Sequence, residues 1–228
     1  MSSHDFRSLR LSPFRRHLAV VLLVFAGLGT AQGQTVFWSN MDATTSTSNG
    51  PSYSHRRASD VAQSFTTGPN ATTLVSITLP ITASSGSGFN LGLYTDSSSL
   101  PGTLLETLAD RTTPTVGNNT YTSSGAIVLE ANTTYWWVAQ SDTYYSYSYT
   151  LGMTTSTSGV APDGWTTGGA YYTTAYDPRG AQGAWNSYGS DSFKFALSAS
   201  AIPEPGTTAV LAGLLALGFA ASPRRRRR

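Results

Sequence analysis

The side chains of this chain that are best suited to bind a ligand are aromatic. They lie among serines, threonines and glycines in the second half of the sequence, and the candidates are Tyr145, Tyr147, Tyr149, Trp165, Tyr171 and Tyr172. A flat amphipathic ring beside hydroxyl groups can stack on the apolar face of a sugar while the hydroxyls bond to its polar edge. These residues therefore raise the hypothesis of a polysaccharide-binding site.

The spacing of the tyrosines has a second interpretation. Tyr145, Tyr147, Tyr149 and Leu151 occupy every other position, and each residue between them is serine or threonine. A strand with one buried face has this period of two. The alternation therefore favours core packing, and the sugar platform stays as the competing hypothesis.

Residues for catalysis are few. The stretch 34–199 holds one histidine, His55, no cysteine and two glutamates, Glu106 and Glu130. A serine triad needs a histidine beside a nucleophile elbow, and no such elbow is present in the sequence. We expect a non-enzymatic protein that needs no cofactor and no metal. The alternative is a secreted polysaccharide hydrolase in which Glu106 or Glu130 meets an aspartate across a sugar bond.

The charge distribution argues against a nucleic-acid partner. The whole chain carries a net charge of +2, but nine of its fourteen basic residues lie in the two end segments. The stretch 34–199 has five basic and ten acidic residues, a difference of −5. Binding a phosphate backbone needs clustered lysine and arginine, so we exclude DNA and RNA.

The amino-terminal residues 1–33 have the order of a secretory signal peptide. Four arginines precede the apolar run 18–28, and small and polar residues follow it. Eleven apolar residues are too few for a membrane span, which needs about 20. We predict export, with signal peptidase as a processing partner.

The carboxy-terminal residues 200–228 predict a membrane-targeting tail. A nearly uninterrupted apolar run, 206–221, is followed by a basic cluster made of Arg224, Arg225, Arg226, Arg227 and Arg228. Arginine stays on the cytoplasmic side of a membrane, so this cluster predicts a stop-transfer signal after a short transmembrane helix. The stretch 34–199 would then lie across the membrane from both ends.

The motif Pro203, Glu204 and Pro205, the apolar run and the terminal arginines resemble the PEP-CTERM sorting signal of bacterial exported proteins. The prolines resist helix formation and leave an extended segment that a membrane protease can read. The resemblance implies an exosortase as the processing partner, transient membrane anchoring, and release to the cell envelope, outer surface or extracellular matrix. An ordinary tail anchor is the alternative.

The stretch 34–199 shows the periodicity of strands. Val75, Ile77, Leu79 and Ile81 alternate with polar or proline residues, and aromatic and β-branched residues fill 134–139. Phe193, Phe195 and Leu197 repeat the alternation, and turn-forming clusters lie at 66–70, 83–88, 96–99 and 116–119. We predict an all-β domain, an antiparallel β-sandwich of jelly-roll-like form.

Four segments of this domain, 62–68, 89–94, 100–105 and 129–136, are similar to the choice-of-anchor R domain. That family shares an extracellular domain among different surface-attachment tails. The likeness implies the placement and the sandwich fold, and it transfers no catalytic or binding residue. The sequence thus predicts an exported surface or matrix protein, associated with exopolysaccharide if the aromatic residues bind sugar.

Overall fold

The structure is a computed structural model that describes residues 35–49, 52–54, 57–86, 88–141, 147–156, 159, 164–175 and 183–202. The predicted signal peptide, the motif at 203–205 and the arginine cluster lie outside these residues. Within the described part of the chain, no helix has the length and apolar character needed to cross a membrane.

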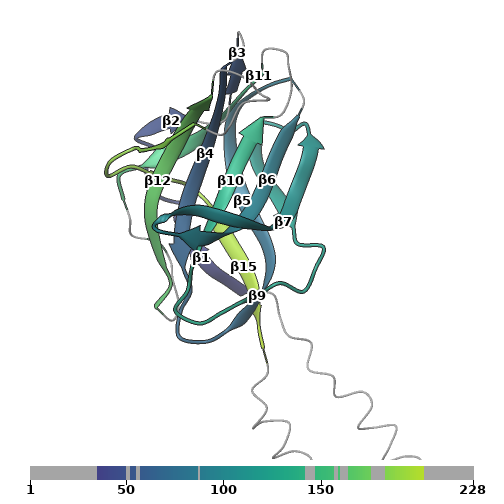
Figure 1. Ribbon diagram of the computed structural model, residues 1–228, viewed down its shortest axis with the longest axis vertical. Coiled ribbons are helices and arrows are strands. Elements are labelled where there is room, and N and C mark those ends of the chain that lie inside the picture. The colour runs from purple at the N-terminus through teal and green to yellow at the C-terminus, as the bar shows by residue number, and fades with distance from the viewer. Residues whose placement is uncertain are drawn as a thin grey trace, which may run out of the picture. The chain divides into compact units, whose positions relative to one another are not determined.

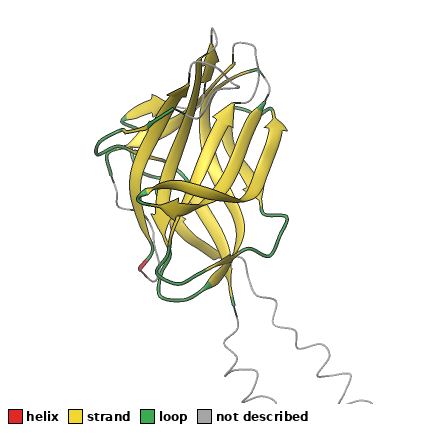
Figure 2. Ribbon diagram, in the orientation of Figure 1, coloured by secondary structure: helices red, strands yellow, loops and turns green. Residues whose placement is uncertain are grey.

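The described residues form strands that pair antiparallel throughout, which confirms the prediction of an all-β domain (Figure 2). The strands in chain order are β1 (Thr35–Ser39), β2 (Thr47–Asn49), β3 (Ser52–Ser54), β4 (Arg57–Thr66), β5 (Thr72–Ser85), β6 (Phe89–Ser97), β7 (Leu100–Thr112), β8 (Gly117–Thr122), β9 (Val128–Leu129), β10 (Thr134–Ser141), β11 (Tyr147–Thr154), β12 (Thr166–Ala175), β13 (Trp185–Ser187), β14 (Ser192–Phe193) and β15 (Ala196–Ala201).

The strands are arranged in two layers (Figure 1). One layer contains β1, β15, β5 and β11, hydrogen-bonded in that sequence, with β15 and β11 along one edge of β5 and β8 along the other. The five-stranded layer has the order β12, β4, β10, β6, β7. The short strand β3 pairs with both β11 and β4, so one continuous network of strand pairs links the two layers. The remaining short strands extend the layers at β5, β11 and β12.

Four strand pairs are nested within one another along the chain. β1 pairs with β15, β4 with β12, β5 with β11, and β6 with β10. Each pair encloses the next, so the outermost partners come from opposite ends of the domain. Most of the packing therefore depends on contacts between residues far apart in sequence.

The core between the layers is built largely of aromatic rings. Phe65 and Trp137 from the five-stranded layer face Phe193 and Phe195 from the other side, with ring centroids 5.4 to 6.3 Å apart. All four side chains are buried. Tilted and edge-to-face rings at these separations attract one another beyond the burial of their area. This core holds the domain together without disulfides, since the chain has no cysteine.

Two buried amides support the segment at which β14 gives way to β15. Asn40 donates from Nδ2 to the Phe193 carbonyl oxygen at 3.0 Å, and its Oδ1 accepts from the Phe195 backbone N–H at 2.7 Å. From the opposite layer, Gln63 Oε1 accepts from the Phe193 N–H at 2.9 Å. These side chains satisfy backbone groups that would otherwise be buried without partners.

A bulge changes the predicted phase of β5. Ile77, Leu79 and Ile81 are buried as expected, but Val75 is only half-buried and Leu74 takes its place in the core. The pairing with β15 shifts at this point, where Ser198 lies opposite Ser76 and the next residue lies opposite Leu74. The prediction that Val75 faces the core was wrong, because one extra residue in a strand reverses which side chains point inward.

The turn predicted at 96–99 is confirmed. Ser98 and Ser99 have φ angles of 54° and 64°, and Asp96 Oδ2 accepts from the Ser99 N–H at 3.2 Å, which closes the tight turn between β6 and β7. The turn predicted at 116–119 was wrong in its position. Strand β8 already begins at Gly117, and Asn119 reaches back from that strand to bond the backbone of Thr115.

We expect replacement of Gln63 by leucine to lower the free energy of unfolding by about 3 kcal/mol, because it leaves several buried backbone groups unpaired. Gln140→Leu is the matched control, since Gln140 is half-buried and its amide donates to Asp60 at 3.2 Å. Its loss should cost under about 1 kcal/mol. Urea denaturation of both variants measures the difference, and equal losses would contradict the role given to Gln63.

Candidate functional site

Two of the aromatic residues predicted to bind sugar lie in the core. Tyr149 is 1% exposed and packs edge-to-face on Phe89 with the ring centroids 5.2 Å apart. Trp165 is 3% exposed and stacks on Phe65 at 6.2 Å with an angle of 7° between the ring planes. Neither ring is available to a ligand. For Tyr149 the strand-face interpretation was correct, because its alternation with polar residues reflects burial.

The other candidates divide between the two faces of the five-stranded layer. Tyr172 is half-buried, packs against the main core and lies 4.8 Å from the ring of Tyr188. Tyr171, its neighbour in β12, points to the opposite face. Tyr145 lies outside the described residues, as does the side chain of Tyr147, whose backbone pairs with Tyr53. Among the predicted sugar-binding residues whose side chains the structure describes, Tyr171 is thus the one that lies on the outer face of this layer.

A second apolar cluster lies on that outer face. It consists of the buried Ala62, Trp136 and Val138, with Tyr94, Tyr171 and Trp185 packed against it. We call it the outer cluster. Successive side chains of a strand point to opposite faces, so Trp136 joins this cluster while Trp137 enters the core. The adjacent tryptophans were the signal in the sequence that one large ring had to lie outside the core.

The outer cluster borders a cavity of about 260 Å³. We call it the Tyr171 cavity, and it is lined by Ser64, Thr66, Asp96, Ser99, Thr134, Trp136, Gly168, Gly169 and Tyr171. Tyr171 packs edge-to-face on Trp136 with ring centroids 5.4 Å apart. Trp136 is 2% exposed, so it forms the wall of the cavity and leaves the half-buried Tyr171 as the more accessible ring.

A charge-assisted hydrogen bond places the turn of the β6–β7 hairpin at this cavity. Trp136 Nε1 donates to Asp96 Oδ1 at 2.7 Å, and Asp96 also accepts from the Ser99 N–H. Strands β6 and β12 are separated in the layer by β10 and β4, yet Ser99 and Gly169 line the same cavity. The turn therefore reaches across the outer face, where Figure 1 shows the hairpin passing in front of the layer.

Glycines and a core amide shape the opposite side of the cavity. A Cβ atom at Gly169 would lie 2.7 Å from Tyr171 Cε2, and one at Gly168 would overlap the Ser64 hydroxyl. Both positions lie in the bulge of β12, between Thr167 and Ala170. Gln63 Nε2 donates to the carbonyl oxygens of Gly168 at 2.8 Å and Gly169 at 3.3 Å. The same buried side chain that supports the core therefore holds the bulge in place.

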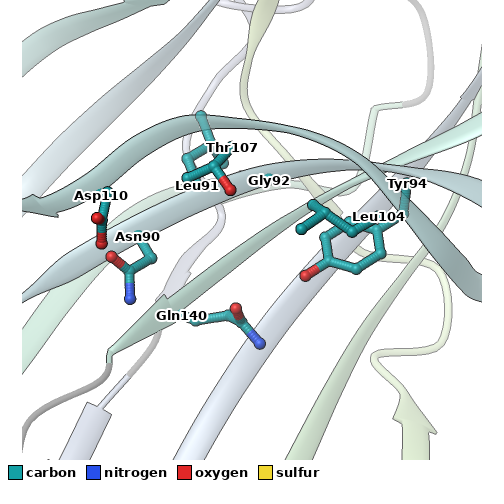
Figure 3. Close-up of a pocket in the computed structure, with 8 residues that line it drawn as sticks. All are labelled: Asn90, Leu91, Gly92, Tyr94, Leu104, Thr107, Asp110 and Gln140. Atoms are coloured by element: carbon teal, nitrogen blue, oxygen red, sulfur yellow. The ribbon is translucent and has the colours of Figure 1, made fainter.

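A second cavity of about 290 Å³ lies farther along the same layer (Figure 3). We call it the Asp110 cavity, and it is lined by Asn90, Leu91, Gly92, Tyr94, Leu104, Thr107, Asp110 and Gln140. The ring of Tyr94 lies against Gly92, where an added Cβ would be 2.7 Å from Tyr94 Cε2. Burial, and then the charge of Asp60, raise the pKa of the Tyr94 phenol. The phenol therefore stays protonated as a hydrogen-bond donor.

The two glutamates of the hydrolase alternative line neither cavity. Glu106 accepts hydrogen bonds from the Ser123 and Ser124 hydroxyls and from the backbone N–H groups of Ser124 and Gly125, at 2.6 to 3.1 Å. Partial burial raises the pKa of this carboxyl, but the four hydrogen bonds together lower it below its usual 4.5. Glu106 therefore ties a loop to β7 as an ionised carboxylate, a state unsuited to a general acid.

Glu130 is an exposed residue of the turn between β9 and β10. Its backbone N–H donates to the Tyr135 hydroxyl at 2.9 Å, and its carbonyl oxygen accepts from the Thr67 hydroxyl at 2.6 Å. His55 lies outside the described residues. Within the described ranges, no three histidine, aspartate or glutamate side chains gather as metal ligands would.

Positive charge is scarce around both cavities. Among the side chains that the structure describes, Lys194 is the only lysine or arginine, and it lines neither cavity. The carboxylates of Asp96 and Asp110 line one cavity each. The groups that the two cavities present to a ligand are thus aromatic rings, hydroxyls, amides and carboxylate acceptors.

Comparison with known proteins identifies no family. No family model matches the chain, and a search of curated proteins finds no match. The resemblances noted at 203–205 and across 62–136 therefore stay predictions from the residues.

We expect Glu106→Gln to lower stability at neutral pH and to have progressively less effect in acid. A carboxyl whose folded-state pKa is lowered stabilises the fold above its unfolded pKa of 4.5, and this contribution is lost as the pH falls through the folded-state value. Urea denaturation of both proteins from about pH 7 to about pH 3 measures the gap. A gap that is constant across this range would show that the charge of Glu106 is not what ties the loop to β7.

Proposed function

We propose that the domain is a non-enzymatic glycan-binding module of an exported surface or matrix protein. The observation that carries the proposal is the Tyr171 cavity, where an aromatic ring, hydroxyl groups and one carboxylate converge on the face of a layer that points away from the core. Sugar binding needs this combination, because a sugar ring has an apolar face and a polar rim.

The position of the outer cluster supports binding over a purely structural role. The main core already buries the inner face of the five-stranded layer, including Phe65 and Trp137. Stability alone does not require Trp136, Tyr171, Tyr94 and Trp185 to gather on the outer face as well. Beside them lie the hydroxyls of Thr66, Thr134 and Ser99. The two threonine hydroxyls bond to each other at 2.9 Å, which leaves one proton of the pair and the remaining lone pairs for a ligand.

The hydrolase alternative has less support. A pair of carboxyl groups must flank the scissile bond, one of them able to donate a proton. Glu106 already accepts four hydrogen bonds from the loop at 123–125, and Asp96 accepts from Trp136 and Ser99. Each of the two cavities has a single carboxylate among its lining residues, Asp96 in one and Asp110 in the other.

The fold we propose is a jelly-roll-like β-sandwich. An eight-stranded jelly roll pairs its first strand with its last and continues inward, as the four nested pairs do here. The pairing sequence β1, β15, β5, β11 follows that scheme, with β15 and β11 sharing one edge of β5. The other layer differs, because β4 and β10 are its central partners and β7 extends its edge. These central strands carry Ser64 and Trp136 at the middle of the outer face.

Location is the part of the proposal that depends on the two ends of the chain. Signal peptidase would remove residues 1–33, and an exosortase would act at Pro203, Glu204 and Pro205 after the apolar run and arginines engage the membrane. The bound partner outside the cell would be exopolysaccharide. Fractionation of cells producing the full chain tests this, and we expect a shortened product in the envelope or medium. Unprocessed chain dissolved in the cytosol would contradict it.

We expect Tyr171→Ala to weaken polysaccharide binding at least about tenfold, since losing one aromatic contact of about 1.4 kcal/mol has that effect. Affinity gel electrophoresis of the exported domain in dextran, xylan, β-1,3-glucan and alginate measures the retardation. Migration that no polysaccharide retards, relative to a gel without polysaccharide, would contradict the proposal.

A matched pair of turn variants controls for folding. Ser98 and Ser99 both have positive φ angles, so glycine at either position relieves the same backbone strain. Ser99 lines the Tyr171 cavity and Ser98 does not. We expect Ser99→Gly to weaken binding about fivefold, the value of roughly one hydrogen bond, and Ser98→Gly to leave it unchanged. Equal effects of the two would place the ligand elsewhere.

A further inference from the structure

The Tyr171 cavity and the Asp110 cavity share a wall. Trp136 lines the first and Tyr94 lines the second, and these residues lie directly opposite one another in the β10–β6 pair. Side chains of directly opposed residues on one face of a sheet are in contact range. The cavities are therefore neighbours on one surface.

Together the cavities cross the whole five-stranded layer. The Tyr171 cavity is lined from β12, β4, β10 and the β6–β7 hairpin turn, and the Asp110 cavity from β10, β6 and β7. Neighbouring strands lie about 4.8 Å apart, so the path from β12 to β7 is about 19 Å long. This path exceeds one sugar ring and suits several linked rings laid across the strands.

Side chains of the outer cluster fill the row between the cavities. Ala62, Val138 and Gly92 lie side by side across β4, β10 and β6 and are buried, because Tyr94, Tyr171 and Trp185 pack over this row. Beside them Gln140 donates to Asp60 at 3.2 Å, and Asn90 lies opposite Gln140 in the next strand. A ligand that reaches both cavities therefore crosses the half-buried rings of Tyr94 and Tyr171, with the Gln140 amide beside Tyr94 in the Asp110 cavity.

The charges along this path favour an uncharged ligand. Asp60, Asp96 and Asp110 lie on the outer face, whereas the described side chains around both cavities include no lysine or arginine. Carboxylates accept hydrogen bonds from sugar hydroxyls, and they repel the negative charges of uronate or sulfate groups.

We propose that the two cavities are adjacent subsites of one extended site, and that the ligand is a linear, uncharged polysaccharide lying across the strands from β12 to β7. The inference rests on the proposed glycan binding and adds to it the length and charge of the ligand. When one polysaccharide molecule fills both subsites, its affinity rises, because the second contact is made by a ligand that is already bound.

Calorimetric titration with purified oligomers of dextran, xylan and β-1,3-glucan, and of the uronate polymer alginate, from disaccharide to hexasaccharide, tests this. We expect affinity for at least one uncharged series to rise about tenfold or more with length.

The double variant Thr107→Ala/Asp110→Ala alters exposed residues of β7 that line the second subsite alone. It should remove most of the gain with length while affinity for the disaccharide stays within about twofold. Asp42→Ala changes an exposed aspartate that lines neither cavity and should match the unaltered protein.

The outcomes separate the two proposals. Short and long oligomers that bind equally, or a double variant that behaves like the Asp42 variant at every length, would overturn the extended site and leave glycan binding in place. Tighter binding of alginate oligomers, which carry uronate charges, would overturn the uncharged ligand. Absence of binding to any oligomer or polysaccharide would overturn both proposals.

Discussion

The buried amide of Gln63 is the contact on which both the core and the candidate site depend. Its oxygen crosses between the layers to accept from the Phe193 backbone, and its nitrogen donates to the carbonyls of the β12 bulge at Gly168 and Gly169. A fully buried polar group is stable only when its hydrogen bonds are made. The geometry of the core and the shape of the Tyr171 cavity are therefore coupled through one side chain.

The nested strand pairing explains why such coupling is needed. β1 and β15 join the two ends of the domain, and the segment between β14 and β15 interrupts the ladder inside the core. Asn40 and Gln63 replace the missing ladder bonds there, while the rings of Phe193 and Phe195 fill the space on either side. Without disulfides, these amides and rings supply the cross-layer contacts.

Strand β10 shows how one element serves stability and binding together. Trp137 packs into the aromatic core, and Trp136 faces the outer surface, bonds to Asp96 and supports Tyr171. The hairpin turn that Asp96 closes is thereby held at the cavity, and its Ser99 becomes part of the lining. A rigid layer that carries a ligand surface on its outer face needs little rearrangement on binding, which lowers the entropic cost.

The sequence alone determined that the middle of this chain is all-β, because the alternation at 77–81 and 193–197 reflects a local rule about which side chains face inward. It could not determine that Val75 points outward, since that depends on a bulge in pairing with β15. Nor could it separate Tyr149 and Trp165 in the core from Tyr171 at the cavity, or foresee Asp96, Trp136 and Gln140 on one face. The same aromatic residue types occur in a protein core and on a binding surface, so residue type does not reveal which of the two a ring belongs to. Only the stacking order of strands far apart in sequence decides which rings meet each other and which remain open to a ligand.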